Sequence, residues 1–132
     1  MLKGSCLCGA VTYEAEALAF PPTHCHCRTC QKAHAAAFAT TARVRRENFR
    51  WTGGEDVLGA YESTPGKLRR FCTRCGSQLI SEWVAQPMVI LRIATVEEGD
   101  IPAPVAHIWT DHRPAWDAAR DDLIEHPQGM PR

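Results

Sequence analysis

The grouping of seven cysteines constrains this chain more than any other feature of its sequence. The central group lies in the stretch His-Cys-His-Cys-Arg-Thr-Cys over residues 24–30, with thiols at Cys25, Cys27 and Cys30. One pair lies upstream, at Cys6 and Cys8, and another lies downstream, at Cys72 and Cys75. No cysteine is left over. We therefore expect one closed site on the two outlying pairs and a second, open site on the central group.

The surroundings of these thiols favour metal binding over disulfides. The N-terminus carries no apolar run after Lys3, so the sequence predicts no signal peptide and a cytoplasmic protein. In a reducing compartment, thiols serve metals or catalysis. The odd number of cysteines also argues against a closed disulfide framework.

Zinc suits the two outlying pairs. It prefers thiolate or imidazole ligands in a tetrahedron, with a Zn–S bond of about 2.3 Å and sulfurs ~4 Å apart. The two-residue gap between Cys72 and Cys75 lets the backbone wrap beneath a metal, and Gly76 permits the left-handed turn that follows. The upstream pair has only one residue between its cysteines and is also followed by a glycine, Gly9. We expect a structural zinc that clips the N-terminal strand to the middle of the chain, held by Cys6, Cys8, Cys72 and Cys75.

The downstream pair by itself has another interpretation. Cys-x-x-Cys is also typical of redox dithiols beside βαβ patterns. No βαβ pattern is present in this sequence, whereas a second cysteine pair followed by glycine is. Zinc is therefore favoured.

The central group offers three sulfurs, so a zinc on it keeps one coordination position open, as catalytic zinc sites do. His24 or His26 could instead complete a closed second structural site, but a histidine next to a ligand cysteine rarely reaches the same metal. His34 is expected to be a surface or hydrogen-bonded histidine. Three thiolates leave zinc net negative, which favours binding an incoming thiol as thiolate over activating water.

Basic residues near these groups have two interpretations. Arg28 and Lys32 could temper the charge of the three thiolates or could be solvated. Two further clusters could meet the carboxylates of a ligand, but solvated basic strand edges are favoured for both. They are Arg43, Arg45 and Arg46, and Lys67, Arg69 and Arg70.

The rest of the pattern predicts a mainly β domain with little helix. Val11 and Tyr13 alternate with polar residues, as in a half-buried strand. Further short strands are expected over 38–44, 48–52, 57–62, 67–71, 78–83 and 88–94. Helix is expected only over 31–37, as one or two turns, and over 115–124. We predict a single domain over 1–125 and a loose tail over 126–132.

Size and charge exclude some classes of function. The chain has 132 residues, which suits one domain. Its 15 basic and 15 acidic residues balance, which argues against nucleic-acid binding. No apolar run reaches the length of a membrane-spanning helix, so no membrane partner is expected.

Five motifs in this order resemble the glutathione-dependent formaldehyde-activating family, which shares its domain with centromere-protein-V-type proteins. They are Gly-Ser-Cys-Leu-Cys-Gly-Ala-Val at 4–11, Cys-His-Cys-Arg-Thr-Cys at 25–30, Phe-Arg-Trp-Thr-Gly-Gly at 49–54, Phe-Cys-Thr-Arg-Cys-Gly at 71–76 and His-Ile-Trp at 107–109. The resemblance implies a β-tent type zinc-stabilised fold of several short antiparallel sheets, which methionine-R-sulfoxide reductases also use.

The resemblance also implies roles for the cysteines. It places a structural zinc on Cys6, Cys8, Cys72 and Cys75, and a second, more labile zinc, associated with glutathione, on Cys25, Cys27 and Cys30. The family's named activity makes S-hydroxymethylglutathione from glutathione and formaldehyde and is classed as a carbon–sulfur lyase. We therefore expect an enzyme with two zinc ions, a small-molecule thiol and aldehyde as partners, and Arg28 as a glutathione contact.

Two alternatives remain at this point. The chain could be a non-catalytic zinc-stabilised module that binds a protein or small-molecule partner. It could also reduce methionine sulfoxide on the same fold, but that chemistry needs a free cysteine of low pKa. If both zinc sites are filled, no such cysteine is spare.

Overall fold

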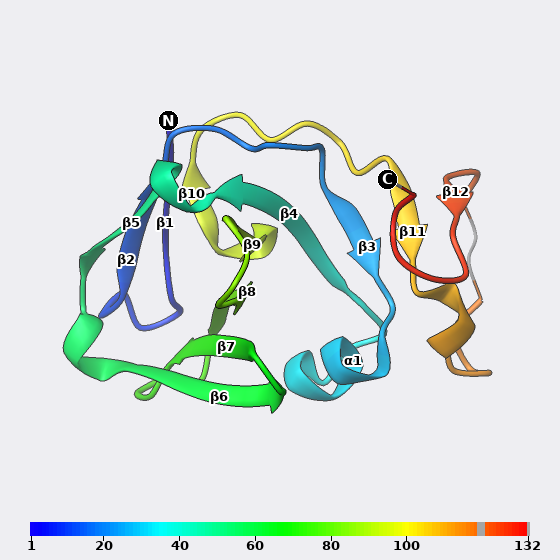
Figure 1. The fold of residues 1–132 in the computed structure, drawn as a ribbon, viewed down its shortest axis with the longest axis horizontal. Helices are drawn as coiled ribbons and strands as arrows, with labels where there is room; N and C mark the ends of the chain where they lie inside the picture. Colours follow the sequence, from blue (N-terminus) through cyan, green and yellow to red (C-terminus); the bar gives the residue numbers. More distant parts are fainter. Residues whose placement is uncertain (119–120, 132) are drawn as a thin grey trace.

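The computed structural model describes residues 1–118 and 121–131 of a mainly β chain, whose strands form two sheets (Figure 1). The smaller sheet is antiparallel, in the order β10-β1-β2-β5. Its strands are β1 (Leu2–Ser5), β2 (Thr12–Ala15), β5 (Phe49–Gly53) and β10 (Val96–Glu98). The prediction of a mainly β fold with little helix is confirmed.

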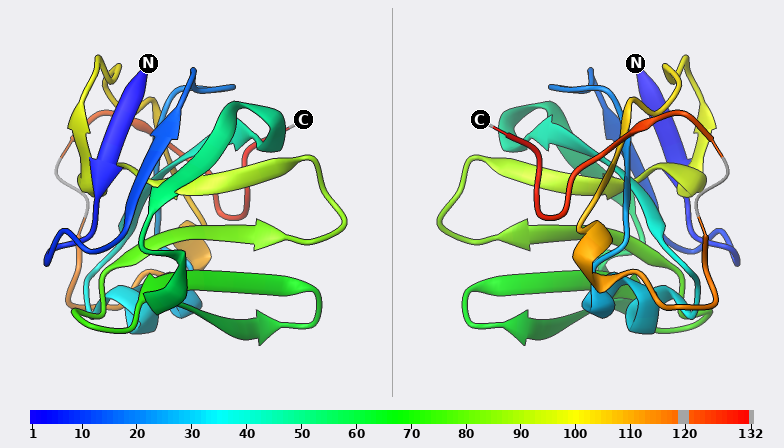
Figure 2. Two further views of the ribbon diagram at one scale, coloured as in Figure 1. Left: turned by 90° about the vertical axis from the view of Figure 1, so that its left-hand side faces the viewer. Right: turned by 90° about the vertical axis from the view of Figure 1, so that its right-hand side faces the viewer.

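The larger sheet has the order β12-β11-β3-β4-β9-β8-β7-β6. Its strands are β3 (Thr23–Cys25), β4 (Ala39–Arg45), β6 (Leu58–Thr64), β7 (Lys67–Cys72), β8 (Gln78–Trp83), β9 (Met88–Arg92), β11 (Ala106–Ile108) and β12 (Ile124–Glu125). Figure 2 shows β6 to β9 side by side.

One part of this sheet departs from the predicted antiparallel pairing. Strand β11 runs parallel to both β3 and β12. The segment before it, which contains Pro102 and Pro104, crosses the top of the molecule from β10 to the far edge (Figure 1). Proline has no backbone donor, so this segment forms no strand of its own and delivers β11 beside β3.

Helix is short and begins earlier than predicted. The α-helix α1 (Arg28–His34) starts directly after Cys27, whose Sγ accepts a hydrogen bond from the backbone N–H of Cys30 and caps the first turn. The 3₁₀ helices are η1 (Arg46–Asn48), η2 (Glu55–Val57), η3 (Ile93–Thr95) and η4 (Thr110–His112). None of the helices in the described ranges is both long and apolar enough to cross a bilayer.

The helix predicted over 115–124 does not form in its described residues, which adopt turns, bends and the start of β12. The Asp121 carboxylate accepts a hydrogen bond from the backbone N–H of Leu123. Such a local side-chain acceptor offers the backbone an alternative to helix. The segment expected to be a loose tail contacts the chain, because the Trp109 and Thr110 N–H groups donate to carbonyls of Gln128 and His126.

The core joins the two sheets and brings distant cysteines together. Its buried residues come from β1, β2 and their connection on one side and from β4, β7, β8 and β9 on the other: Leu2, Cys6, Val11, Tyr13, Ala15, Val44, Cys72, Leu79, Ile80, Val89 and Leu91. The β1–β2 and β7–β8 turns consequently lie at the same end of the molecule (Figure 2).

Candidate metal centres

The two outlying cysteine pairs meet as predicted from the sequence. Cys6 and Cys8 lie in the β1–β2 connection, Cys72 ends β7, and Cys75 lies in the turn before β8. Their four Sγ atoms lie within 4.8 Å of one another, with 3.6 Å between Cys6 and Cys8 and 3.8 Å between Cys8 and Cys72. A tetrahedron with Zn–S bonds of about 2.3 Å requires this spacing. The group fits a closed metal site.

Local backbone donors prepare this group for a metal. The N–H groups of Val11 and Arg74 lie 3.3 and 3.4 Å from the Sγ atoms of Cys6 and Cys72. A hydrogen bond from the Ser77 hydroxyl lowers the pKa of the Cys75 thiol to about 5. Donors to sulfur favour the thiolate, which is the form that binds metal.

The central group contains three cysteines and no histidine among the described residues. Cys25 ends β3, Cys27 caps α1, and Cys30 lies in the first turn of that helix, with its Sγ 3.6 Å from that of Cys25. His24 instead bonds to the Thr40 hydroxyl at 2.8 Å, and His26 bonds to a second histidine. The histidines that could have completed a closed site therefore have other partners.

Two buried arginines lie beside the central group. Arg69 on β7 and Arg92 on β9 are 3% and 4% exposed. Arg69 Nη1 lies 4.0 Å from the Cys30 Sγ, and Arg92 donates to Ser81 Oγ at 3.0 Å and to His34 Nε2 at 3.2 Å. Neither guanidinium has a carboxylate partner within the described part of the chain.

These arginines supply the charge that compensates the thiolates. The pKa of the Cys30 thiol is lowered by hydrogen bonds from the Cys25 and Cys27 thiols and further by the charges of Arg92 and Arg69. A buried charge without an opposite charge is costly, so a thiolate at Cys30 and the two guanidiniums stabilise each other. A metal with three thiolates would carry net negative charge, which the two arginines more than balance.

The prediction that Arg69 belongs to an exposed basic edge is wrong. Strand β7 is not an edge strand, because β6 pairs with one side of it and β8 with the other. Arg70 and Arg46 reach the Glu82 carboxylate at 3.3 and 3.0 Å, while Arg43 and Arg45 are exposed.

A groove of about 520 Å³ opens beside the central group, between α1 and strands β6 to β8. Figure 1 shows α1 facing these strands. Lys32 and Arg69 make the groove cationic, and none of the described residues that line it is acidic. The lining residues are Thr29, Lys32, Ala33, Tyr61, Ser63, Arg69, Phe71 and Gln78. The charge of the groove suits an anionic ligand.

Residues 1–112 match the model of the family described as glutathione-dependent formaldehyde-activating enzyme. The chain belongs to this family. A protein of Halomonas elongata named "Putative glutathione-dependent formaldehyde-activating enzyme" is 29% identical over 88% of this chain and 79% of the relative. The structure is also similar to the crystal structure of a Rhodobacter sphaeroides protein, with a TM-score of 0.63 and 26% identity over 74% of this chain and 90% of that one.

Family membership, predicted from five sequence motifs, is thereby confirmed. Arg28, which was predicted from the sequence as a glutathione contact, is not among the described residues that line the groove. Its guanidinium donates to the Gln31 side chain at 3.0 Å, and its backbone N–H donates to His112 Nδ1 at 3.1 Å. Gln31 in turn donates to the carbonyls of His26 and His112, which fastens α1 to the C-terminal segment.

Sequence reasoning missed a histidine pair behind the central group. His26 Nε2 lies 2.8 Å from His107 Nδ1, and His107 Nε2 lies 3.0 Å from an oxygen of Asp121. Burial lowers the pKa of His26 to about 4, so its ring is neutral near pH 7. The family motif at 107–109 marks this region, but the contact follows only from the structure, in which β11 pairs with β3 and His107 bonds to His26. The histidine pair supports residues 25–30, which carry the central cysteines, from the side of β11.

Replacing Arg92 with methionine should weaken metal binding at the central group while the four-cysteine group keeps its metal. The variant removes a buried charge and preserves much of the side-chain volume, so the fold should survive. We expect the affinity for the second metal to fall on the order of tenfold or more, measured by competition with a chelator. Arg45→Met, an exposed change on β4, should leave both affinities unchanged. Equal affinities in Arg92→Met and the unaltered chain would contradict a role in charge compensation.

Proposed function

We propose that the chain catalyses the addition of glutathione to formaldehyde or a related small aldehyde, and its reversal, as a zinc-dependent carbon–sulfur lyase-type enzyme. The observation that carries the proposal is the open three-cysteine group beside two buried arginines and a cationic groove. The family and the Halomonas elongata relative are both described by glutathione-dependent formaldehyde activation, which supports this choice of substrates. We place the reaction in the cytoplasm, where thiols stay reduced.

Cys25, Cys27 and Cys30 would hold a zinc ion, which, when bound, keeps the sulfur of glutathione as a nucleophilic thiolate. Cys6, Cys8, Cys72 and Cys75 would hold the second, structural zinc. The chemistry of the donors fits zinc, because thiolates select soft or borderline metals.

The groove would bind the rest of glutathione. Lys32 and Arg69, which line the groove, would meet its carboxylates, in place of the role predicted for Arg28. Tyr61 and Phe71 offer apolar surface to the peptide backbone, and the Ser63 hydroxyl, which accepts from Arg69 Nε at 3.1 Å, fixes that guanidinium. Binding at both ends orients the sulfur, and orientation lowers the entropic part of the barrier.

In the forward direction glutathione gives its thiol proton to water, and the thiolate sulfur forms a bond to the carbonyl carbon of the aldehyde. The π electrons of the C=O bond move to oxygen, which takes a proton from water. The reverse reaction breaks the C–S bond and returns the proton. Arg69 and Arg92 remain charged throughout and offset the negative charge of the thiolates.

Exchange NMR of glutathione with formaldehyde tests the proposal. The zinc-loaded protein should raise the exchange rate between free and S-hydroxymethylated glutathione in proportion to its concentration. The exchange of cysteamine, which has a thiol but no carboxylate, should be accelerated less, because cysteamine cannot pair with Lys32 and Arg69. Absence of both acceleration and glutathione binding would instead favour the alternative, a non-catalytic zinc-stabilised binding module.

A further inference from the structure

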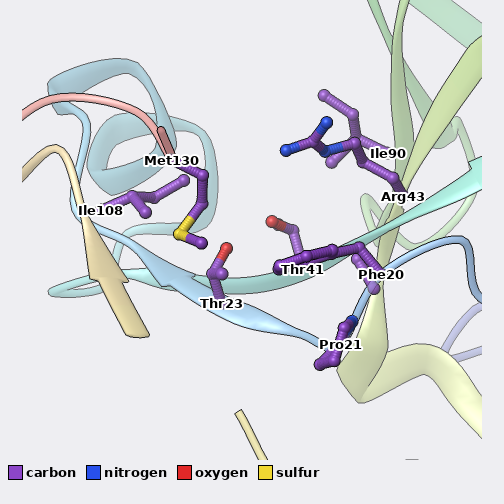
Figure 3. Close-up of a pocket in the computed structure, with 9 residues that line it drawn as sticks. Phe20, Pro21, Thr23, Thr41, Arg43, Ile90, Ile108 and Met130 are labelled. Carbon is purple, nitrogen blue, oxygen red and sulfur yellow. The ribbon is translucent and has the colours of Figure 1, made fainter. Parts of the chain in front are cut away.

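A second, smaller cavity lies where strands β3, β4, β9 and β11 meet the C-terminal segment (Figure 3). Its volume is about 90 Å³, and it is lined by Phe20, Pro21, Thr23, Thr41, Ala42, Arg43, Ile90, Ile108 and Met130. A water molecule needs roughly 10–15 Å³ of such space, so the cavity has room for several heavy atoms. It shares no lining residue with the groove beside the central cysteines.

The hydroxyl groups of two largely buried threonines face this cavity. Thr23 and Thr41 are direct neighbours across the β3–β4 pair and are 6% and 5% exposed. Figure 3 shows both hydroxyls directed into the cavity. Neither side chain forms a hydrogen bond within residues 1–118 and 121–131. Both hydroxyl oxygens are accessible from the cavity, since neither is among the fully enclosed polar atoms that lack a partner. An occupant of the cavity can therefore hydrogen-bond to both threonines.

Arg43 adds a positive charge at the same place. Its Cζ lies 5.8 Å from the centroid of the Phe20 ring, and Figure 3 shows the guanidinium on the side of the cavity between Thr41 and Met130. In the described ranges it makes no ion pair. The remaining walls, among them Ile90 and Ile108, are apolar. Two hydroxyls, one free cation and apolar walls match a small anion with a hydrocarbon body.

We propose that this cavity binds a short-chain aliphatic carboxylate. The carboxylate accepts hydrogen bonds from the Thr23 and Thr41 hydroxyls and faces the Arg43 guanidinium, a charge-assisted arrangement. The hydrocarbon chain packs against Ile90, Ile108 and Met130. The site is independent of the cysteine groups, so it stands whether or not the chain activates formaldehyde.

Titration of the zinc-loaded, ¹⁵N-labelled protein with butyrate tests this site. Saturable shifts should appear at the amides of residues 20, 23, 41–43, 90, 108 and 130, with a Kd on the order of millimolar, in keeping with so few ligand atoms. Butyramide has the same shape without the charge and should bind at least about tenfold more weakly. Absence of saturable shifts at these residues, or equal affinity for butyramide, would overturn the proposal.

Variants separate this site from general electrostatic attraction. Arg43→Gln should weaken butyrate binding about tenfold, and Thr41→Val, which removes one hydroxyl at constant shape, should weaken it several-fold. Arg45→Gln makes the same charge change on the same strand outside the cavity and should leave the affinity unchanged. An equal loss in Arg43→Gln and Arg45→Gln would show that butyrate is attracted only by net charge. If Thr41→Val does not fold, the comparison of Arg43→Gln with Arg45→Gln still tests the proposed site.

Discussion

Replacing Cys72 with serine should leave the chain unfolded at 25 °C. Cys72 is fully buried, belongs to the core and ends β7, where its sulfur lies beside that of Cys8. Structural zinc contributes about 10–16 kcal/mol in small zinc domains, whereas whole domains are stable by only about 5–15 kcal/mol. Losing one of the four ligands therefore removes most of the free energy of unfolding. Circular dichroism and zinc content of the purified protein measure the effect.

Cys8→Ser separates loss of a ligand from burial of a hydroxyl. Cys8 is exposed, so serine there costs nothing in desolvation, yet it removes a ligand from the same group. We expect Cys8→Ser to unfold as well, and a strong chelator to unfold the unaltered chain. If Cys72→Ser stays folded, or if only the buried variant unfolds, the four-cysteine group does not hold the structural metal.

The cysteine groups were predictable because metal geometry is local. A two-residue gap followed by Gly76 fixes the spacing of two sulfurs whatever the rest of the chain does, and φ of +79° at this glycine is the left-handed turn that the motif requires. The strands predicted over 48–52, 57–62, 67–71, 78–83 and 88–94 match β5 to β9 within two residues at each end. Alternation indicated 48–52 and 67–71, whereas a continuous apolar run indicated 88–94.

The order of the strands was not predictable in the same way. The burial of Arg69 depends on β7 being a central strand between β6 and β8. The burial of Arg92 likewise depends on β9 lying between β4 and β8. Alternation places a residue on one face of a strand but does not say whether that face meets solvent or another element. Charged residues are rarely buried without a partner, so sequence reasoning placed Arg69 on the surface.

Residues close in space but far apart in sequence were missed for a related reason. The contact between His26 and His107 joins positions 81 apart through a parallel pairing that three-residue strands do not signal. The same pairing brings Ile108 beside Thr23 in the small cavity. Strands as short as β3 and β11 carry too few residues for alternation to be recognised in the sequence.

Cys27→Ser should produce a folded protein that has lost the second metal and the exchange activity. Serine is among the best N-cap residues, so its hydroxyl can accept the Cys30 N–H that the Cys27 sulfur accepts at 3.3 Å. The helix and the core should therefore persist. With two thiolates left, we expect zinc content to fall from two to one per chain. Acceleration of glutathione exchange should drop by more than about 100-fold, since changes outside the ligand shell alone cost 10–100-fold.

Cys27→Asp is the matched variant, because aspartate also caps helices and can still bind zinc through oxygen. It should recover part of the zinc occupancy that Cys27→Ser loses, and with it part of the activity. Two zinc ions in Cys27→Ser would show that Cys27 is not a ligand. Undiminished exchange in a variant that has lost the second zinc would move the reaction away from the central group. The two measurements therefore test the ligand role and the catalytic role separately.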